Sequence, residues 1–240
     1  SFCVKLILTI KLIYLFLSMV AKLLDTKLEF PPYRKALSDP DGLIALGGKL
    51  TPDWLITAYK KGIFPWSIDD NEILWWCPSE RAVLIPGEMK ISKSLQKTLR
   101  IKKFTIRFDY NFSEIINLCS KNENRNDETW ITRNMIQAYC KLHDLGISHS
   151  IAVYEKDRLV GGLYGVEIGR IFCGESMFQL SSDASKVAFY YLQEYLKKRQ
   201  FKLIDCQVMN PHLQSLGVKL ITREEFMGIV KANLSIETES

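Results

Sequence analysis

The segment from residue 149 to residue 208 constrains the fold of this chain most, because its strands and turns follow in a short, regular order. Three strand patterns joined by two tight turns occupy residues 149–155, 159–167 and 170–178, and links this short join antiparallel neighbours. A helix is expected from about residue 184 to 199, followed by a strand over 201–208. The helix serves as a crossover, so the last strand runs parallel to its neighbour. This order predicts a compact α/β arrangement.

Two of these strands carry polar side chains among apolar neighbours. By the two-residue period, Asp205 and Gln207 lie on one face of the last strand, and Ile204 and Cys206 lie on the other. Glu175 stands in a similar apolar setting on the strand before the helix. A buried carboxylate or amide without a partner is costly, so these groups need partners or water. Two acids and an amide on neighbouring strands predict a small anionic pocket.

The first half of the chain contains loops and helices with clear punctuation. Residues 30–50 are rich in Pro, Gly and Asp and predict loops. Thr51 and Pro52 are typical of the first positions of a helix, and Gly62 is typical of its end. Further elements are expected at 81–86 (strand), 91–100 (helix), 104–108 (strand), 112–120 (helix), 133–145 (helix) and from about 223 (helix).

We therefore expect an α/β (α+β) chain in three parts. Residues 25–118 form a smaller N-terminal α+β domain that carries a basic helix, and residues 119–240 form the catalytic domain. Residues 1–24 are an apolar extension outside the fold, broken by Lys5 and Lys11. A signal segment or membrane anchor is one interpretation. We favour translated upstream sequence, because the chain starts at Ser1 and Met19 precedes an ordinary globular sequence.

The charge balance permits a nucleic-acid partner. The chain has a net charge of +5 with 47% hydrophobic and 25% charged residues, as in ordinary globular proteins. Residues 90–107 contain seven basic residues and no acidic one. Such a run is either a solvated helix face or a surface for phosphates, and the absence of compensating acids favours phosphate binding.

The cysteines and histidines do not have the spacing of a metal site. The six cysteines are scattered without a CxxC pair, which suggests small core residues in a reducing cytosol. The three histidines add no ligand spacing, so we expect no metal. His149, at a strand start, is expected to be structural.

The order of three strands, helix and strand resembles the second half of a GNAT-type acyltransferase. Members that use acyl-CoA carry a glycine-rich loop before the helix, whose amides hold the pyrophosphate. The corresponding residues 179–186 (QLSSDASK) have no glycine, and Asp183 would repel a phosphate. The resemblance therefore implies a GNAT-like C-terminal domain and disfavours an acyl-CoA donor.

Six short motifs in order are similar to the bacterial leucyl/phenylalanyl-tRNA–protein transferase family. They are GLIALGG at residues 42–48, GIFPW at 62–66, LWW at 74–76, TWIT at 129–132, FCGESMF at 172–178 and LIDCQV at 203–208. One such string is weak, but six in register are specific, and the similarity runs from residue 30 to 226.

This resemblance implies a cytoplasmic, monomeric aminoacyltransferase. Such an enzyme moves Leu or Phe from its tRNA to the α-amino group of proteins with N-terminal Arg or Lys, which marks them for N-degron degradation. It implies no cofactor, since the ester to tRNA is already activated. Leu-tRNA, Phe-tRNA and the acceptor proteins would be its partners.

The resemblance also implies roles for particular residues. Asp205 and Glu175 are expected to receive the cationic N-terminal residue through charge-assisted hydrogen bonds, and Asp205 with Gln207 to orient and deprotonate the attacking amine. Trp66 and Trp130 match positions near the tRNA 3′ adenosine, where a tryptophan can stack on a base. Core packing is the alternative role for both tryptophans.

The remaining donor contacts are expected from apolar and basic side chains. Position suggests an acyl side-chain pocket formed by Leu163, Phe172, Met177 and Phe189, although each is also a typical core residue. The basic helix is expected to contact the tRNA backbone without reading sequence, through Lys90, Lys93, Lys97 and Arg100.

Two other functions remain open from the sequence. The first is an acyl-CoA-dependent GNAT N-acetyltransferase, which the missing phosphate loop disfavours. The second is a non-catalytic module that binds tRNA or protein N-termini. It would keep the basic helix and the tryptophans but would not need Gln207 beside Asp205.

Overall fold

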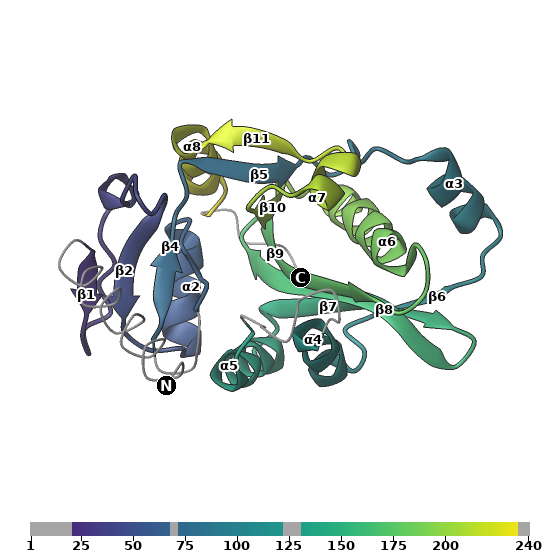
Figure 1. Ribbon diagram of the computed structural model, residues 1–240, viewed down its shortest axis with the longest axis horizontal. Coiled ribbons are helices and arrows are strands. Elements are labelled where there is room, and N and C mark those ends of the chain that lie inside the picture. Colours follow the sequence, from purple (N-terminus) through teal and green to yellow (C-terminus); the bar gives the residue numbers. More distant parts are fainter. Residues whose placement is uncertain (1–20, 68–71, 122–130, 235–240) are drawn as a thin grey trace, which may run out of the picture.

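The computed structural model describes residues 21–67, 72–121 and 131–234, which form two sheets and their covering helices (Figure 1). The smaller sheet has the order β1-β2-β4-β3. Its strands are β1 (Lys22–Leu24), β2 (Leu43–Gly47), β3 (Phe64–Pro65) and β4 (Leu74–Trp76). The helical segments beside it are η1 (Tyr33–Lys35) and α2 (Pro52–Lys60).

The larger sheet has the order β11-β5-β10-β9-β8-β7-β6. Its strands are β5 (Glu80–Leu84), β6 (Thr105–Phe108), β7 (Ser148–Glu155), β8 (Arg158–Ile168), β9 (Ile171–Gln179), β10 (Leu203–Gln207) and β11 (Lys219–Thr222). The helices around it are α3 (Lys93–Arg100), α4 (Phe112–Ser120), α5 (Arg133–Asp144), α6 (Ala184–Lys198), α7 (Pro211–Ser215) and α8 (Arg223–Asn233).

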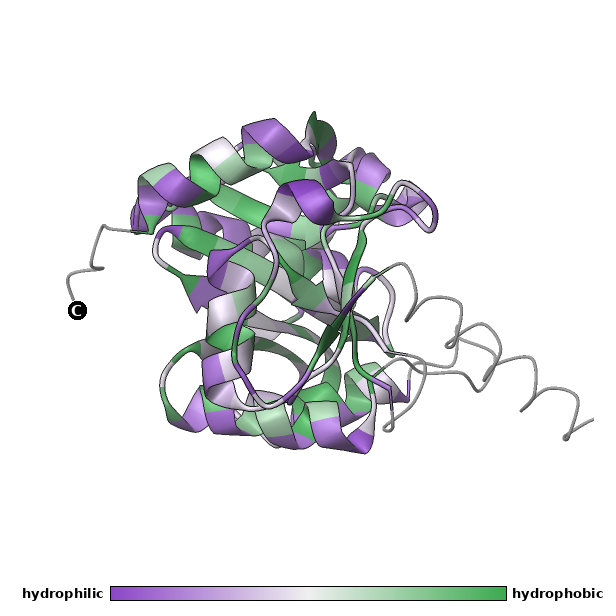
Figure 2. Ribbon diagram, turned by 90° about the vertical axis from the view of Figure 1, so that its left-hand side faces the viewer, coloured by the Kyte–Doolittle hydropathy of each residue, from purple (hydrophilic) through white to green (hydrophobic). Residues whose placement is uncertain are grey.

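Helices cover both faces of the larger sheet. On one face lies α6, and α4 and α5 lie on the other (Figure 1). Val187 and Leu192 of α6 share a buried cluster with Leu163 of β8, whereas Ile115 of α4 and Ala138 of α5 belong to the cluster on the opposite face. Figure 2 shows apolar strands inside and polar residues along the outer helices.

Local sequence signals explain where several helices begin. Thr132 accepts a hydrogen bond from the backbone of Met135 at the start of α5, and Thr222 forms a capping box with Glu225 at the start of α8. The helix expected from residue 91 begins at Lys93, because Ser92 is its N-cap. Ile91 therefore lies outside the helix and is 42% exposed.

The predicted order of three strands, helix and strand is confirmed. Strands β7, β8 and β9 pair in antiparallel fashion, and β10 returns after α6 to pair with β9 in parallel. The expected alternation of faces along β10 holds only up to Asp205, because the register against β5 shifts between Asp205 and Gln207. A mixed α/β fold is thus present, with an irregular strand where the polar residues lie.

Two expectations about the division of the chain need correction. The apolar extension was expected to lie outside the fold through residue 24, but β1 pairs in parallel with β2 and Leu24 is buried. The expected boundary between residues 118 and 119 does not separate the sheets, since β5, β6 and α4 all belong to the larger-sheet layer. Within the three described ranges, no helix is long and apolar enough to span a membrane.

Candidate active site

The parallel strands β9 and β10 part in the middle of the larger sheet and leave a cavity. Their pairing runs from Leu203↔Ile171 to Asp205↔Cys173 and stops there. Beyond this point a cavity of about 210 Å³ opens between the strands. Its walls come from β8, β9, α6 and the segment after β10, with Trp66 at one side. All three polar residues singled out in the sequence lie at or next to this break.

A bulge places Glu175 at the break. Gly174 is opposite Gly165 on β8 and Ser176 is opposite Tyr164, so Glu175 is an extra residue without a cross-strand partner. Such bulges turn a side chain away from the regular alternation. A glycine is needed at 165, because a Cβ there would lie 2.4 Å from the carbonyl oxygen of Cys173.

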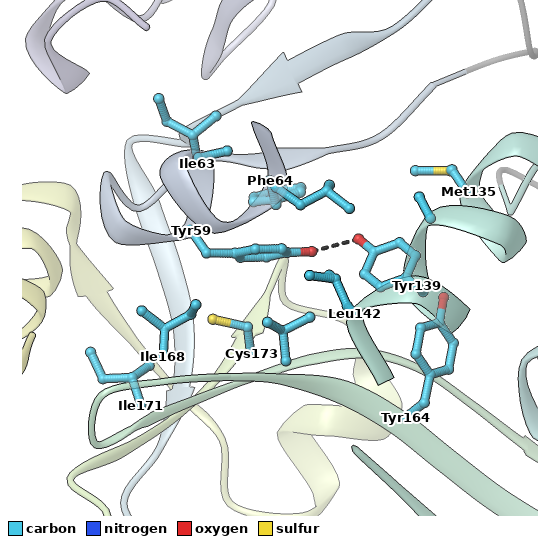
Figure 3. Packing of buried hydrophobic residues seen from close by; sticks show 14 of the residues in the cluster. Tyr59, Ile63, Phe64, Met135, Tyr139, Leu142, Tyr164, Ile168, Ile171 and Cys173 are labelled. Carbon is cyan, nitrogen blue, oxygen red and sulfur yellow. Dashed lines mark hydrogen bonds between the residues drawn. The ribbon is translucent and has the colours of Figure 1, made fainter. Parts of the chain in front are cut away.

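Three side chains from different elements donate hydrogen bonds to Glu175. Tyr59 of α2 lies 2.7 Å and Gln207 lies 2.8 Å from Oε1, and Tyr139 of α5 lies 3.0 Å from Oε2. The two tyrosine hydroxyls also lie within hydrogen-bond distance of each other (Figure 3). Because each hydroxyl has a single proton, the bond between them alternates with one of the two bonds to Glu175. Glu175 is only 8% exposed, so these donors replace the water that a carboxylate would otherwise bind.

Burial controls the protonation of this acid. Removal from water raises the pKa of Glu175 to about 7, although the hydrogen bonds from Tyr59 and Tyr139 favour its ionised form. The negative charge of Asp205 raises this pKa further, and the positive charge of Arg81 lowers it. A carboxyl group with this pKa can take up and release a proton near neutral pH.

The structure corrects the expected role of Asp205. Its carboxylate is fully buried and makes a two-pronged ion pair with Arg81, with both nitrogen–oxygen distances 2.8 Å. The guanidinium lies between the rings of Phe64 and Phe226. Asp205 therefore cannot serve as an open receptor for an incoming cation, because its partner is already part of the protein.

Gln207 follows Asp205 in an unusual backbone conformation. Its φ is +62°, in the left-handed region, and its backbone N–H donates to Oδ1 of Asp205 at 2.9 Å. The side-chain Nε2 donates to Glu175, which leaves the carbonyl Oε1 as the acceptor that Gln207 can offer to an amine. Asp205, Gln207 and Glu175 are thus joined into one network, as the expected pocket required.

Three of the four expected acyl-pocket residues line the cavity. Leu163, Met177 and Phe189 are on its wall, together with Leu192. Phe172 lies instead beside a separate small cavity that shares Leu163 and Leu192 with the first one. Its position, two residues before the strands part, leaves it in the core beneath the main cavity.

Trp66 lies at the cavity and is 44% exposed, with its ring centroid 6.2 Å from that of Trp76. An exposed tryptophan face of this kind is available for stacking. Trp130 lies outside the described residues.

The basic residues Lys90, Lys93, Lys97 and Arg100 are all exposed on or just before α3. This helix lies at the opposite end of the molecule from the smaller sheet (Figure 1). Thr98 on the same helix hydrogen-bonds to Asp183 at the start of α6. The helix is therefore held by its inner side while its lysines face solvent.

Sequence reasoning missed Tyr59, Tyr139 and Arg81 as parts of the site. The sequence placed Tyr59 only within the helix that starts at Pro52, and Arg81 only at the start of an expected strand. In the part of the chain that the structure describes, no group of three His, Cys, Asp or Glu residues is placed to hold a metal ion.

The strand order and the cavity between two parted parallel strands define a mixed α/β fold with a candidate active site in the larger sheet. The chain belongs to the leucyl/phenylalanyl-tRNA protein transferase family. The model of that family matches residues 83–231, and the model of the N-terminal domain of the same family matches residues 48–79.

Relatives of similar length support this membership. A leucyl/phenylalanyl-tRNA–protein transferase of Azoarcus sp. (strain BH72) is 49% identical over 197 residues, which cover 82% of this chain and 84% of the relative. The protein of the same name from Shewanella piezotolerans is 50% identical over 202 residues, covering 84% and 86%.

A GCN5-related N-acetyltransferase from Kribbella flavida is a distant structural neighbour. Its TM-score is 0.38 at 10% identity, with 78% of this chain and 68% of that chain covered.

Proposed function

We propose that this protein is an aminoacyltransferase that moves Leu or Phe from aminoacyl-tRNA to the α-amino group of proteins beginning with Arg or Lys. Family membership supports the reaction class. The observation that carries the assignment of the site is Glu175, a buried acid with a pKa near 7 at the break between β9 and β10. The acceptor specificity and the marking of substrates for degradation come from the resemblance.

The reaction is an aminolysis of the ester that joins the amino acid to tRNA. The amine nitrogen of the acceptor bonds to the ester carbonyl carbon, and the bond from this carbon to the ribose oxygen breaks. The amine loses a proton, and the ribose oxygen gains one. Glu175 takes the proton from the amine and returns it to the leaving oxygen, which a carboxyl group with a pKa near 7 can do in both directions.

Gln207 orients the attacking amine in this proposal. A glutamine is a poor base, but its carbonyl oxygen accepts a hydrogen bond from the amine while Nε2 stays on Glu175. Because the ester is already reactive, holding the amine and the ester in the right positions supplies much of the rate acceleration. This mechanism uses no cofactor or metal.

The donor amino acid occupies the apolar side of the cavity. Leu163, Met177 and Phe189 contact its side chain, and the flexible methionine suits both Leu and Phe. Trp66 stacks on the 3′ adenosine, with Trp130 as a second expected contact. The lysines of α3 attract the phosphate backbone of the tRNA.

The acceptor is attracted by net negative charge. Glu175, Asp205 and Arg81 together carry one excess negative charge when Glu175 is ionised. An N-terminal Arg or Lys residue brings a positively charged side chain to this region, and the long-range attraction favours it over a neutral residue. The protein acts as a monomer in the cytoplasm in this proposal.

A direct transfer assay tests the proposed function. The protein is incubated with radiolabelled Leu-tRNA and one of two peptides that differ only in an N-terminal Arg or Ala. We expect label on the Arg peptide without CoA, and at least about tenfold less on the Ala peptide. No transfer by a folded protein, or transfer only from acetyl-CoA, contradicts the proposal.

A further inference from the structure

A buried arginine that has no step in the proposed mechanism is paired with Asp205 of the proposed catalytic network. Arg81 on β5 is 1% exposed, and its Nε and Nη2 each lie 2.8 Å from an oxygen of Asp205. The rings of Phe64 and Phe226 lie 4.7 and 4.5 Å from the guanidinium carbon. A planar fork between two rings fixes the position of the carboxylate much more tightly than a flexible ammonium group would.

Asp205, held by Arg81, in turn fixes the backbone of Gln207. The same Oδ1 that accepts from Arg81 also accepts the backbone N–H of Gln207. That hydrogen bond holds Gln207 in its left-handed conformation, which a residue with a side chain adopts only when its surroundings support it. The conformation in turn places Nε2 within 2.8 Å of Glu175.

Arg81 also balances charge around Glu175. The titratable groups that surround Glu175 or share its cavity are Tyr59 of α2, Tyr139 of α5, Tyr164 of β8, Cys173 of β9, Asp205 and Cys206 of β10, His212 of α7 and Arg81 of β5. Burial lowers the pKa of His212, which favours its neutral form. Arg81 is the positive member of this set, and it offsets the effect of Asp205 on Glu175. Without it, two acids would face each other across the break.

We propose that Arg81 is a positioning residue for aminoacyl transfer: through its two hydrogen bonds to Asp205 it sets the backbone of Gln207 and thereby the contact of the Gln207 side chain with Glu175. This inference rests on the proposed function, in which ionised Glu175 accepts the proton of the amine. Arg81 itself does not touch either substrate in this scheme.

The pH dependence of transfer separates this role from a merely structural one. In the wild type, kcat falls as the pH drops through the pKa of Glu175. Arg81→Met removes a positive charge and should move this acidic limb to higher pH, whereas Asp205→Asn removes a negative charge and should move it to lower pH. We expect opposite shifts of about half a pH unit or more. The pKa of the acceptor amine is the same in all reactions, so a difference between variants belongs to the protein.

A conservative variant tests the geometry without changing the charge. Arg81→Lys keeps the positive charge, so the acidic limb of the pH profile should not move. It loses the paired hydrogen bonds of the guanidinium to Asp205, so kcat should fall at least about tenfold while KM for Leu-tRNA changes less than about twofold. Circular dichroism and thermal melting show whether Arg81→Met folds. If it does not, the Arg81→Lys and Asp205→Asn variants, each measured separately, still test the inference.

The chain contains a matched control pair. Arg199 forms a fork with Glu167 at 2.8 and 3.2 Å and lies between the rings of Tyr195 and Phe201. Arg199→Met and Glu167→Gln should leave the acidic limb unmoved. If Arg81→Met and Asp205→Asn also leave it unmoved, or shift it in the same direction, the inference is wrong while the proposed function stands. A wild type that transfers no leucine would instead remove the proposed function.

Discussion

At the scale of single residues, two buried acids in one network have different environments and therefore different properties. Asp205 is paired with a guanidinium, which compensates its charge inside the protein. Glu175 has only neutral hydrogen-bond donors, and burial raises its pKa to about 7. Two acids in such different environments are typical of sites in which one acid holds neighbouring groups in position and the other exchanges a proton.

Removing one tyrosine hydroxyl should change the pH dependence of transfer in a defined direction. Tyr139→Phe deletes a hydrogen bond that favours ionised Glu175, so the pKa of Glu175 rises and the fall in kcat begins at higher pH. At pH 7 we expect kcat to be about three- to tenfold lower, the effect of one hydrogen bond. Transfer rates measured from pH 5.5 to 9 check this.

Tyr190→Phe is the control for this change, since Tyr190 lies on α6 and makes a ring contact with Tyr191 rather than a bond to Glu175. A Tyr139→Phe profile that coincides with both the wild type and this control would show that the hydroxyl does not act on Glu175.

The polar residues of the network could be found from the sequence only where they break the local apolar pattern. Glu175, Asp205 and Gln207 stood out because polar groups interrupt apolar strands. Arg81 is separated from its partner by 124 positions, and Tyr59 is separated from Glu175 by 116. A local sequence pattern does not indicate contacts between residues so far apart, so the pairing of Asp205 with Arg81 could not be predicted.

At the scale of elements, α3 is the surface that we propose for the donor tRNA. Charge reversal at Lys93 and Lys97 should weaken the attraction to tRNA without touching the cavity. We expect KM for Leu-tRNA to rise about tenfold or more at low salt while kcat changes little, and the difference from the wild type to shrink as salt is raised. Steady-state kinetics at two salt concentrations measure both effects.

A double reversal at Lys141 and Lys198, on α5 and α6, changes the net charge equally and serves as the control. Equal KM values for the two double variants would remove α3 from the tRNA interface.

The elements themselves were largely predictable, and their pairing was less so. The helix expected at 112–120 is present as α4, and the strands β7 to β9 lie within two residues of their expected bounds, because each has a clear period and a turn at its end. β1 was missed because it is three residues long and pairs with a strand about twenty positions away. The bulge at Glu175 has no sequence period, so only the structure shows it.

At the scale of the whole molecule, the site joins parts of the chain that the sequence alone would divide. Glu175 is reached by Tyr59 from α2, Tyr139 from α5 and Gln207 from β10. Phe64 and Phe226, which are far apart in the sequence, enclose Arg81. The proposed catalytic network therefore forms only when the smaller sheet, its helix and the larger sheet pack together.

Single-turnover transfer with Glu175→Gln tests the central claim most directly. Enzyme in excess over radiolabelled Leu-tRNA is mixed with a saturating peptide that begins with Arg, and binding of Leu-tRNA is measured on the same preparation. If Glu175 carries the proton, the variant binds Leu-tRNA with a Kd within about twofold of the wild type but transfers at least about a hundredfold more slowly, the contribution expected of a general base. Transfer at the wild-type rate by this variant would contradict the account.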